Sequence, residues 1–277
     1  MPLIEIENVS KRYGSVRALE NVSLRMEGSG IMGLLGQNGA GKTTLINILT
    51  GYLAPTSGRA LLGGHDPLME PGEAKRHLGY LPEQPPLYDE MTVREYLRFV
   101  AALKGVAARA IPAHVDEVME LTGLTSMQSR LLGHLSKGFR QRAGMAQALC
   151  GDPDVLVLDE PTAGLDPAGR ENLMANIRDY HRNKKRTIIL VSHSMDEIAR
   201  NVDRILVLKS AHVLMSGTPA EVFARAEELL SAGLDVPQVT RIAMRLREQG
   251  LAIDPAVYTV EALERELLAL RRGETGC

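Results

Sequence analysis

The chain has 277 residues, which is enough for one large domain with an appendage or for two small domains. Hydrophobic residues make up 44% of it and charged residues 24%, a composition typical of soluble globular proteins, and the formal net charge is −2. A protein that follows nucleic-acid phosphates usually carries a basic stripe, so this charge gives no electrostatic case for a nucleic-acid partner.

The number of cysteines and the length of the apolar segments indicate where in the cell the protein acts. The two cysteines, Cys150 and Cys277, are too few for a disulfide framework, which indicates a reducing cytosol. The first residues, Met1 to Glu5, lack the charged and apolar segments of a secretory signal. The apolar runs have the length of strands, far below the ~20 residues needed to cross a bilayer. We therefore expect any membrane role to depend on a partner chain.

Apolar and polar residues alternate through the first thirty residues, which predicts antiparallel strands. An apolar strand over 31–35 then leads into a glycine-rich loop, and a helix over 43–50 follows the loop. Between 91 and 148 the apolar period becomes helical. Two sets of apolar residues there are spaced to share one helix face each: Val93, Leu97, Val100 and Leu103, and then Val115, Val118 and Leu121.

Strands and helices alternate after this helical block. The predicted strands cover 155–158, 187–191 and 205–208, and helices begin near Pro167 and Met195. Such alternation is typical of a parallel sheet with helices on its faces, and the preceding helical block then forms an inserted subdomain. Beyond Gly217 the pattern is entirely helical, which predicts a small C-terminal extension.

The glycine-rich loop has the pattern G-x-x-x-x-G-K-[ST]. Its residues are Gly36, Gln37, Asn38, Gly39, Ala40, Gly41, Lys42 and Thr43, and Thr44 follows. The glycines let the backbone curve around an anion, so that N–H groups and the next helix N-terminus face phosphates. Lys42 then supplies positive charge to the β- and γ-phosphates, and the Thr43 hydroxyl is a ligand for Mg²⁺. The loop therefore predicts a nucleoside triphosphate site.

Two carboxylates, Asp159 and Glu160, directly follow the apolar strand 155–158. Open α/β sheets bind ligands at the carboxyl ends of their strands, and adjacent strand residues point to opposite faces. We therefore expect Asp159 to hold the Mg²⁺ shell and Glu160 to orient or deprotonate an attacking water.

Further motifs resemble those of the ATP-binding cassette (ABC) family. The segment 135–142, Leu-Ser-Lys-Gly-Phe-Arg-Gln-Arg, is similar to the family signature and keeps Ser136 and Gly138, although Lys137 and Phe139 depart from it. The resemblance implies roles for three other residues: Asp166 in a dimer-contacting D-loop, His193 as a switch histidine at the γ-phosphate, and Tyr13 as the aromatic that stacks on adenine. In the segment that resembles the Q-loop, either Glu83 or Gln84 takes the place of the glutamine near Mg²⁺.

The resemblance implies an α/β P-loop fold with a mostly parallel core sheet, an N-terminal antiparallel β subdomain and an inserted helical subdomain. We predict the nucleotide-binding domain over 1–216, with the insertion at about 89–148, and the helical extension over 217–277. One chain carries one phosphate loop and one signature, so the resemblance implies that a second ABC ATPase, identical or related, completes the ATP site.

The transport direction is open at this point. Residues up to about 150 resemble exporter cassettes that partner with ABC-2 membrane subunits, whereas residues from about 152 resemble ATPases of energy-coupling-factor (ECF) importers. Either resemblance implies an ATP-hydrolysing subunit at the cytoplasmic face of the membrane, held there by a polytopic permease. Two alternatives are a soluble ABC ATPase acting on ribosomes or DNA, and a nucleotide-binding regulator with little hydrolysis.

Overall fold

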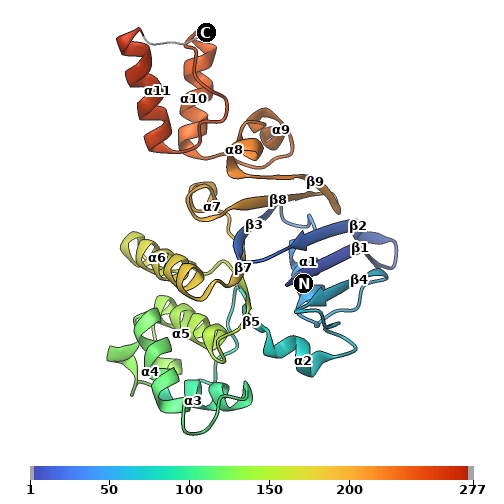
Figure 1. Cartoon of the computed structure of the whole chain (residues 1–277), viewed down its shortest axis with the longest axis vertical. Helices are drawn as coiled ribbons and strands as arrows, with labels where there is room; N and C mark the ends of the chain where they lie inside the picture. The colour runs from blue at the N-terminus through green and yellow to red at the C-terminus, as the bar shows by residue number, and fades with distance from the viewer. Residues whose placement is uncertain (1–2, 274–277) are drawn as a thin grey trace.

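The computed structural model describes residues 3–273, which form two β-sheets with helices around them (Figure 1). The strands are β1 Ile4–Tyr13, β2 Val16–Met26, β3 Gly30–Gly36, β4 Ser57–Leu62, β5 Leu78–Leu81, β6 Val155–Asp159, β7 Thr187–Val191, β8 Arg204–Lys209 and β9 His212–Gly217. The helices are α1 Lys42–Leu49, α2 Pro71–Arg76, α3 Val93–Leu103, α4 Ile111–Thr122, α5 Lys137–Leu149, α6 Pro167–Lys184, α7 Met195–Asn201, α8 Pro219–Phe223, α9 Ala226–Ser231, α10 Gln238–Glu248 and α11 Val260–Arg272, with 3₁₀ turns η1 Thr125–Met127 and η2 Leu132–His134. Cys277 lies outside the described residues, and Cys150 is buried.

The core sheet has the strand order β5-β6-β7-β3-β8-β9. The first five strands are parallel, and β9 pairs antiparallel with β8, so the predicted mostly parallel sheet is confirmed. Asp159 at the end of β6 lies opposite Val191 at the end of β7, and Leu34 of β3 lies opposite the same valine. The residues that follow β3, β6 and β7 therefore meet at one edge of the sheet.

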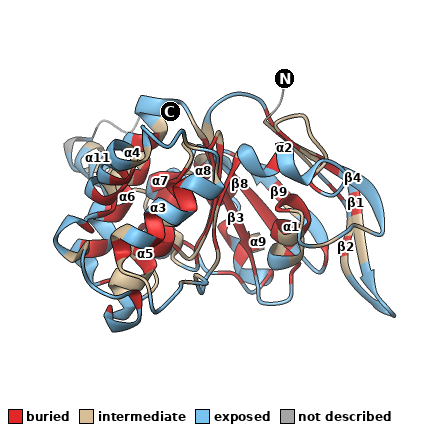
Figure 2. Cartoon of the chain, turned by 90° about the horizontal axis from the view of Figure 1, so that it is seen from below, coloured by how far each residue is buried: buried red, intermediate tan, exposed pale blue. Residues whose placement is uncertain are grey.

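Strand residues alternate between two apolar cores, one on each face of this sheet. Leu156 and Leu158 of β6 pack into the core that includes the helices of the inserted subdomain. Val155 and Val157 pack on the opposite face, in a core that includes α1 and the antiparallel sheet. Figure 2 shows the core strands β3 and β8 as mostly buried. Because both faces are covered, these strands are continuous apolar runs without polar alternation.

The second sheet is antiparallel, with the order β2-β1-β4, which confirms the predicted N-terminal antiparallel unit. In β1, Ile4, Ile6 and Val9 are buried in the same core as α1. The α1 helix therefore packs between the two sheets. The third strand, β4, lies in a segment that the sequence did not mark as a strand.

The inserted helices α3, α4 and α5 pack against one another at one end of the molecule, below the core sheet in Figure 1. Thr92 and Glu95 form a capping box that starts α3. Val93, Leu97 and Val100 are buried as predicted, but the prediction for Leu103 is wrong, since it is 71% exposed. At 3.6 residues per turn, a residue ten positions after Val93 is rotated by about 80° from it, which turns Leu103 out of the buried stripe.

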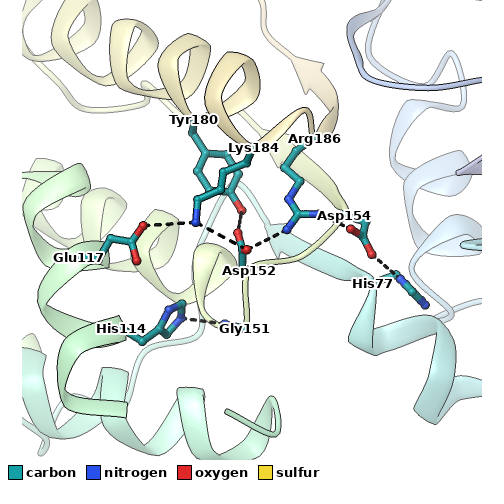
Figure 3. A network of polar contacts seen from close by, with 9 residues as sticks. All are labelled: His77, His114, Glu117, Gly151, Asp152, Asp154, Tyr180, Lys184 and Arg186. Carbon is teal, nitrogen blue, oxygen red and sulfur yellow. Dashed lines mark hydrogen bonds and ion pairs between the residues drawn. The ribbon is translucent and has the colours of Figure 1, made fainter. Parts of the chain in front are cut away.

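A polar network joins the inserted helices to the sheet at the edge opposite the predicted ATP site (Figure 3). Its centre is Asp152, which accepts hydrogen bonds from the Tyr180 hydroxyl at 2.9 Å and from Arg186 at 2.8 Å. Arg186 also pairs with Asp154, and Lys184 lies 3.5 Å from Glu117 of α4. These contacts fix α4 and α6 to the loop before β6 while leaving the carboxyl edge of the sheet free.

The C-terminal helices divide between two cores. Phe223 of α8, Leu229 of α9 and the later residue Val236 belong to the main core. By contrast, α10 and α11 form a separate small cluster that includes Val239 and Leu263. The predicted domain boundary at 216–217 stays a prediction. No helix within residues 3–273 has the length and apolar character needed to span a bilayer.

Candidate ATP site

The phosphate loop connects β3 to α1 as predicted, with Gly36 as the last residue of β3 and Lys42 to Thr44 as the first turn of α1. Gly41 caps the helix with φ at 112°, and a Cβ there would lie 2.5 Å from the Ala18 carbonyl oxygen. Both the backbone conformation and the close approach therefore require glycine. The remaining residues, Gln37, Asn38, Gly39 and Ala40, form the turn.

The Lys42 ammonium group turns back over this loop. It donates hydrogen bonds to the Gly36 carbonyl at 2.6 Å and to the Gln37 carbonyl at 3.2 Å. Burial lowers the pKa of Lys42, and the charges of Asp159 and Glu160 oppose that effect. Asp159 and Glu160 therefore lie near Lys42, as their place at the strand end predicts.

Glu160 combines an unusual backbone conformation with a buried side chain. Its φ is 50°, in the left-handed region, and its backbone N–H donates to the Val191 carbonyl at 3.0 Å. The side chain is only 17% exposed, and its Oε1 is one of three buried polar side-chain atoms without a hydrogen-bond partner within the described part of the chain. Strained backbone and a buried carboxylate oxygen without a hydrogen-bond partner are features of functional sites.

Three carboxylates influence one another here. Burial, followed by the charge of Asp159, raises the pKa of Glu160 to about 7. Burial, followed by the charge of Glu83, raises the pKa of Asp159. Glu83 thus lies within electrostatic range of both, and Gln84 is exposed next to it in the chain. A carboxylate with a pKa near 7 is suited to accept a proton at neutral pH.

His193 follows β7, and its Nε2 lies 3.7 Å from Glu160 Oε1. The ring is 66% exposed, so it projects from the sheet edge into solvent. Next to it, the buried Ser192 donates to Glu197 Oε2 at 3.3 Å, and Thr162 donates to the same oxygen at 3.0 Å. The half-buried Glu197 carboxylate therefore connects the segment after β6 to the segment after β7.

Two residues that hold the segment around Glu160 in place, Gln141 and Glu197, are absent from the site residues predicted from the sequence. Gln141 Nε2 donates to the backbone carbonyl of Glu160 at 3.0 Å, and the Gln141 side chain is buried. It lies inside the segment 135–142 that marks the signature, but only the fold reveals that it faces Glu160 of its own chain. Glu197 looks like an ordinary acidic residue in the first turn of a helix.

Tyr13 ends β1 with 49% of its surface exposed, and Lys11 Nζ lies 5.2 Å from its ring centre. An exposed ring at a strand end offers a flat face to a base. Thr43 is exposed at the start of α1. No group of three or more His, Cys, Asp or Glu residues among those described is arranged to hold a metal by itself.

The signature segment lies apart from the phosphate loop. Ser136 caps α5, accepting from the Phe139 N–H at 3.4 Å, and a Cβ on Gly138 would lie 3.2 Å from the Gly164 carbonyl oxygen. Asp166 caps α6 and accepts from Gly169 N–H at 2.9 Å. Figures 1 and 2 both show α5 well separated from α1. One chain therefore does not bring its signature to its own phosphate loop.

Comparison with known proteins identifies the class. A family described as ABC transporter matches residues 19–163, which is more than half of the chain, so the chain belongs to the ABC transporter ATPase family. It is an ATP-binding, ATP-hydrolysing subunit of such a transporter. The structure of an ATP-binding subunit of an ABC transporter has a TM-score of 0.75 to it, with 26% identity over 88% of this chain and 99% of that one.

More particular relatives are energy-coupling factor transporter ATP-binding proteins. The chain is 34% identical to EcfA2 of Caldanaerobacter subterraneus, with 98% of each chain covered, and 38% identical to EcfA2 of Symbiobacterium thermophilum, with 93% and 92% covered. CbiO1 from Clostridium perfringens, part of the ABC transporter complex cbiONQ, has a TM-score of 0.74, with 28% identity over 89% of this chain and 99% of that one. This similarity also spans the residues before 150, whose motifs alone resemble exporter cassettes.

Proposed function

We propose that this chain is the cytoplasmic ATPase of an ECF-type importer and that it drives uptake through a polytopic membrane subunit. The observation that carries the proposal is full-length similarity to ECF transporter ATP-binding proteins, covering 98% of the chain in one case. The same similarity argues against a ribosome- or DNA-directed ATPase. It favours import over the export that the first half of the sequence suggests.

ATP binding in this proposal uses the phosphate loop and Tyr13. Thr43 and Asp159 would hold Mg²⁺, which stabilises the phosphate charge and usually takes only one or two protein carboxylates besides phosphate oxygens and water. The residues fit such a cation, because the mutual repulsion of Asp159 and Glu83 is relieved by positive charge between them. We therefore assign Glu83, rather than Gln84, to the Q-loop position.

Hydrolysis in this proposal depends on Glu160 as the general base. Its raised pKa leaves about half of the carboxylate ionised at pH 7, and its buried Oε1 is free to accept a proton from water. His193, 3.7 Å away, is placed to contact the γ-phosphate from the adjacent strand end.

A second ATPase subunit would complete the site. Ser136 and Gly138 open α5 at a helix N-terminus, which favours a phosphate, yet α5 lies far from the phosphate loop of the same chain. We propose that each subunit places its Ser136 and Gly138 against the ATP held by the phosphate loop of the other. Asp166 would then lie at the interface between the two subunits.

The membrane subunit would dock on an aromatic surface beside the Q-loop segment. Tyr52 is 73% exposed next to Tyr80, with ring centres 6.2 Å apart, and Tyr88 packs on Phe99 at 5.8 Å. A cavity of about 150 Å³ at the first of these pairs has a lining that includes Tyr52, Tyr80, Pro82, Pro86 and Val100. Exposed apolar surface with a polar rim marks a protein contact site.

The test is affinity capture of the tagged chain from detergent-solubilised membranes of the source cells. We expect a polytopic membrane protein and a second ATPase to be retained by the wild type. Retention should be lost with the double substitution Tyr52→Ala and Phe99→Ala but kept with the exposed control Val213→Ala on β9. Capture of ribosomes without a membrane protein would contradict the proposal.

A further inference from the structure

The segment Gly233–Gln238, which we name the strap, connects α9 to α10 and touches the ATP site at two points. The Gln37 side chain donates a hydrogen bond to the Gly233 carbonyl at 2.8 Å, which links the strap to the phosphate loop. The Gln238 N–H donates to Asp196 Oδ1 at 3.2 Å, which links the strap to the first turn of α7, three residues after His193. The strap therefore contacts both the phosphate loop and the helix that begins just after His193.

The strap is fixed to the ATPase core between these two contacts. Leu234 and Val236 are 9% and 3% exposed and belong to the main core, whereas the helices after the strap pack in a separate cluster. The N–H groups of Gly233 and Leu234 are bonded to Leu230 and Leu229 at the end of α9. The strap is thus a braced segment and not a frayed linker.

Gly233 has the backbone conformation and the open space that the contact with the Gln37 side chain uses. Its φ of 69° lies in the left-handed region, and a Cβ on it would collide with Nε2 of Gln37. The backbone conformation favours glycine, and a side chain at this position would displace the Gln37 amide from its hydrogen bond.

The contact reaches the phosphate-binding lysine. Gln37 donates to the strap through its side chain, while its backbone carbonyl accepts from Lys42 Nζ at 3.2 Å. Two hydrogen bonds on one residue therefore connect Gly233 with the ammonium group. A cavity of about 420 Å³ beside this chain of contacts is lined by Asn38, His193, Leu234 and Asp235, so the strap also forms one wall of the space in front of the phosphate loop.

We propose that the strap positions the ATP site: Gln37 and Asp196 are positioning residues through which the C-terminal extension sets the spacing of the phosphate loop and His193. This inference rests on ATP hydrolysis at the phosphate loop. It assigns Gly233–Gln238 a role in turnover.

The test is a double-mutant cycle with Gln37→Ala and Gly233→Ala in the full chain, measuring ATP affinity by titration and kcat and KM by phosphate release. One hydrogen bond contributes about 1 kcal/mol net, so Gln37→Ala should lower kcat/KM by about fivefold. Gly233→Ala should lower it at least as much, and its effect should be smaller in the Gln37→Ala background, where the clash with the amide is gone and only the strain of the left-handed backbone remains. Equal factors in both backgrounds, or no change from either substitution, would overturn the proposal.

Asp196→Ala tests the second contact independently, and Asp254→Ala is its matched control. Asp254 also accepts a backbone N–H, from Ala256 at 2.8 Å, but in the loop between α10 and α11. We expect Asp196→Ala to lower kcat more than it changes the unfolding midpoint, and Asp254→Ala to leave kcat unchanged. Should Asp196→Ala leave kcat at the wild-type value, the link from the strap to α7 has no part in turnover. Lys42→Ala should abolish hydrolysis if the phosphate loop is the ATPase site. Hydrolysis that persists in this variant would contradict the ATPase assignment itself and not only the role of the strap.

Discussion

Replacing Glu160 by glutamine should abolish turnover and, at neutral pH, stabilise the folded protein. The pKa of Glu160 rises from the usual 4.5 to about 7, chiefly through burial. Because the folded state binds this proton more tightly than the unfolded chain, the stability it contributes is present below pH 4.5 and is lost as the pH rises to about 7. At about 1.4 kcal/mol per pH unit, the ionised carboxylate costs about 3 kcal/mol above pH 7. Glutamine keeps the shape and avoids that cost.

The assay is urea unfolding of wild type and Glu160→Gln without nucleotide, at pH values from 4 to 8. The difference in unfolding free energy should move in favour of the glutamine variant between pH 4.5 and 7 and then become constant. Glu90 provides the control, because Glu90→Gln makes the same chemical change at an exposed position. A pH-independent difference for Glu160→Gln would refute the electrostatic reasoning, and wild-type ATP hydrolysis by this variant would refute the assignment of the base.

Two further substitutions test the site. Tyr13→Ala removes the exposed ring at the end of β1, and since base stacking contributes about 1–3 kcal/mol, the Kd for ATP measured by calorimetry should rise by about fivefold to about 150-fold. Tyr13→Phe should stay near wild type, and equal affinity of Tyr13→Ala and wild type would place the adenine elsewhere. Gln141→Leu removes the donor to the Glu160 carbonyl and should lower the unfolding free energy by about 1–3 kcal/mol and kcat more than KM. A kcat at the wild-type value would separate Gln141 from catalysis.

The phosphate loop and the two carboxylates could be predicted because their evidence is local. Gly36 to Thr43 carry their pattern in consecutive residues, and Asp159 directly ends an apolar strand that is buried on both faces. The parallel topology then brings Asp159 to the end of β7 without further assumptions. By contrast, the short strand β5 has four residues, too few for any period to be visible in the sequence.

The contacts that position these residues could not be predicted, because they join segments far apart in the chain. Gln37 and Gly233 are separated by 196 positions, and Gln141 and Glu160 by 19. A lone glycine after a helix predicts only a helix end. Its second role, leaving room for the Gln37 amide, exists only when the fold brings α9 beside the phosphate loop.

In the pair of subunits that we propose, the placement of α5 lets one helix serve two ATP sites. Its first residues, beginning at the cap Ser136, are the part that we propose to face the nucleotide of a second subunit, while Gln141 holds the Glu160 backbone of its own chain. Five residues of helix separate them by only about 7.5 Å, so the two ends of this segment move as one body. Gly138 also packs against Gly164 and Leu165, in the loop that connects Glu160 to Asp166. If a membrane subunit displaces α5 when it docks, the signature at one ATP and Glu160, the proposed general base, at the other would therefore shift in the same motion.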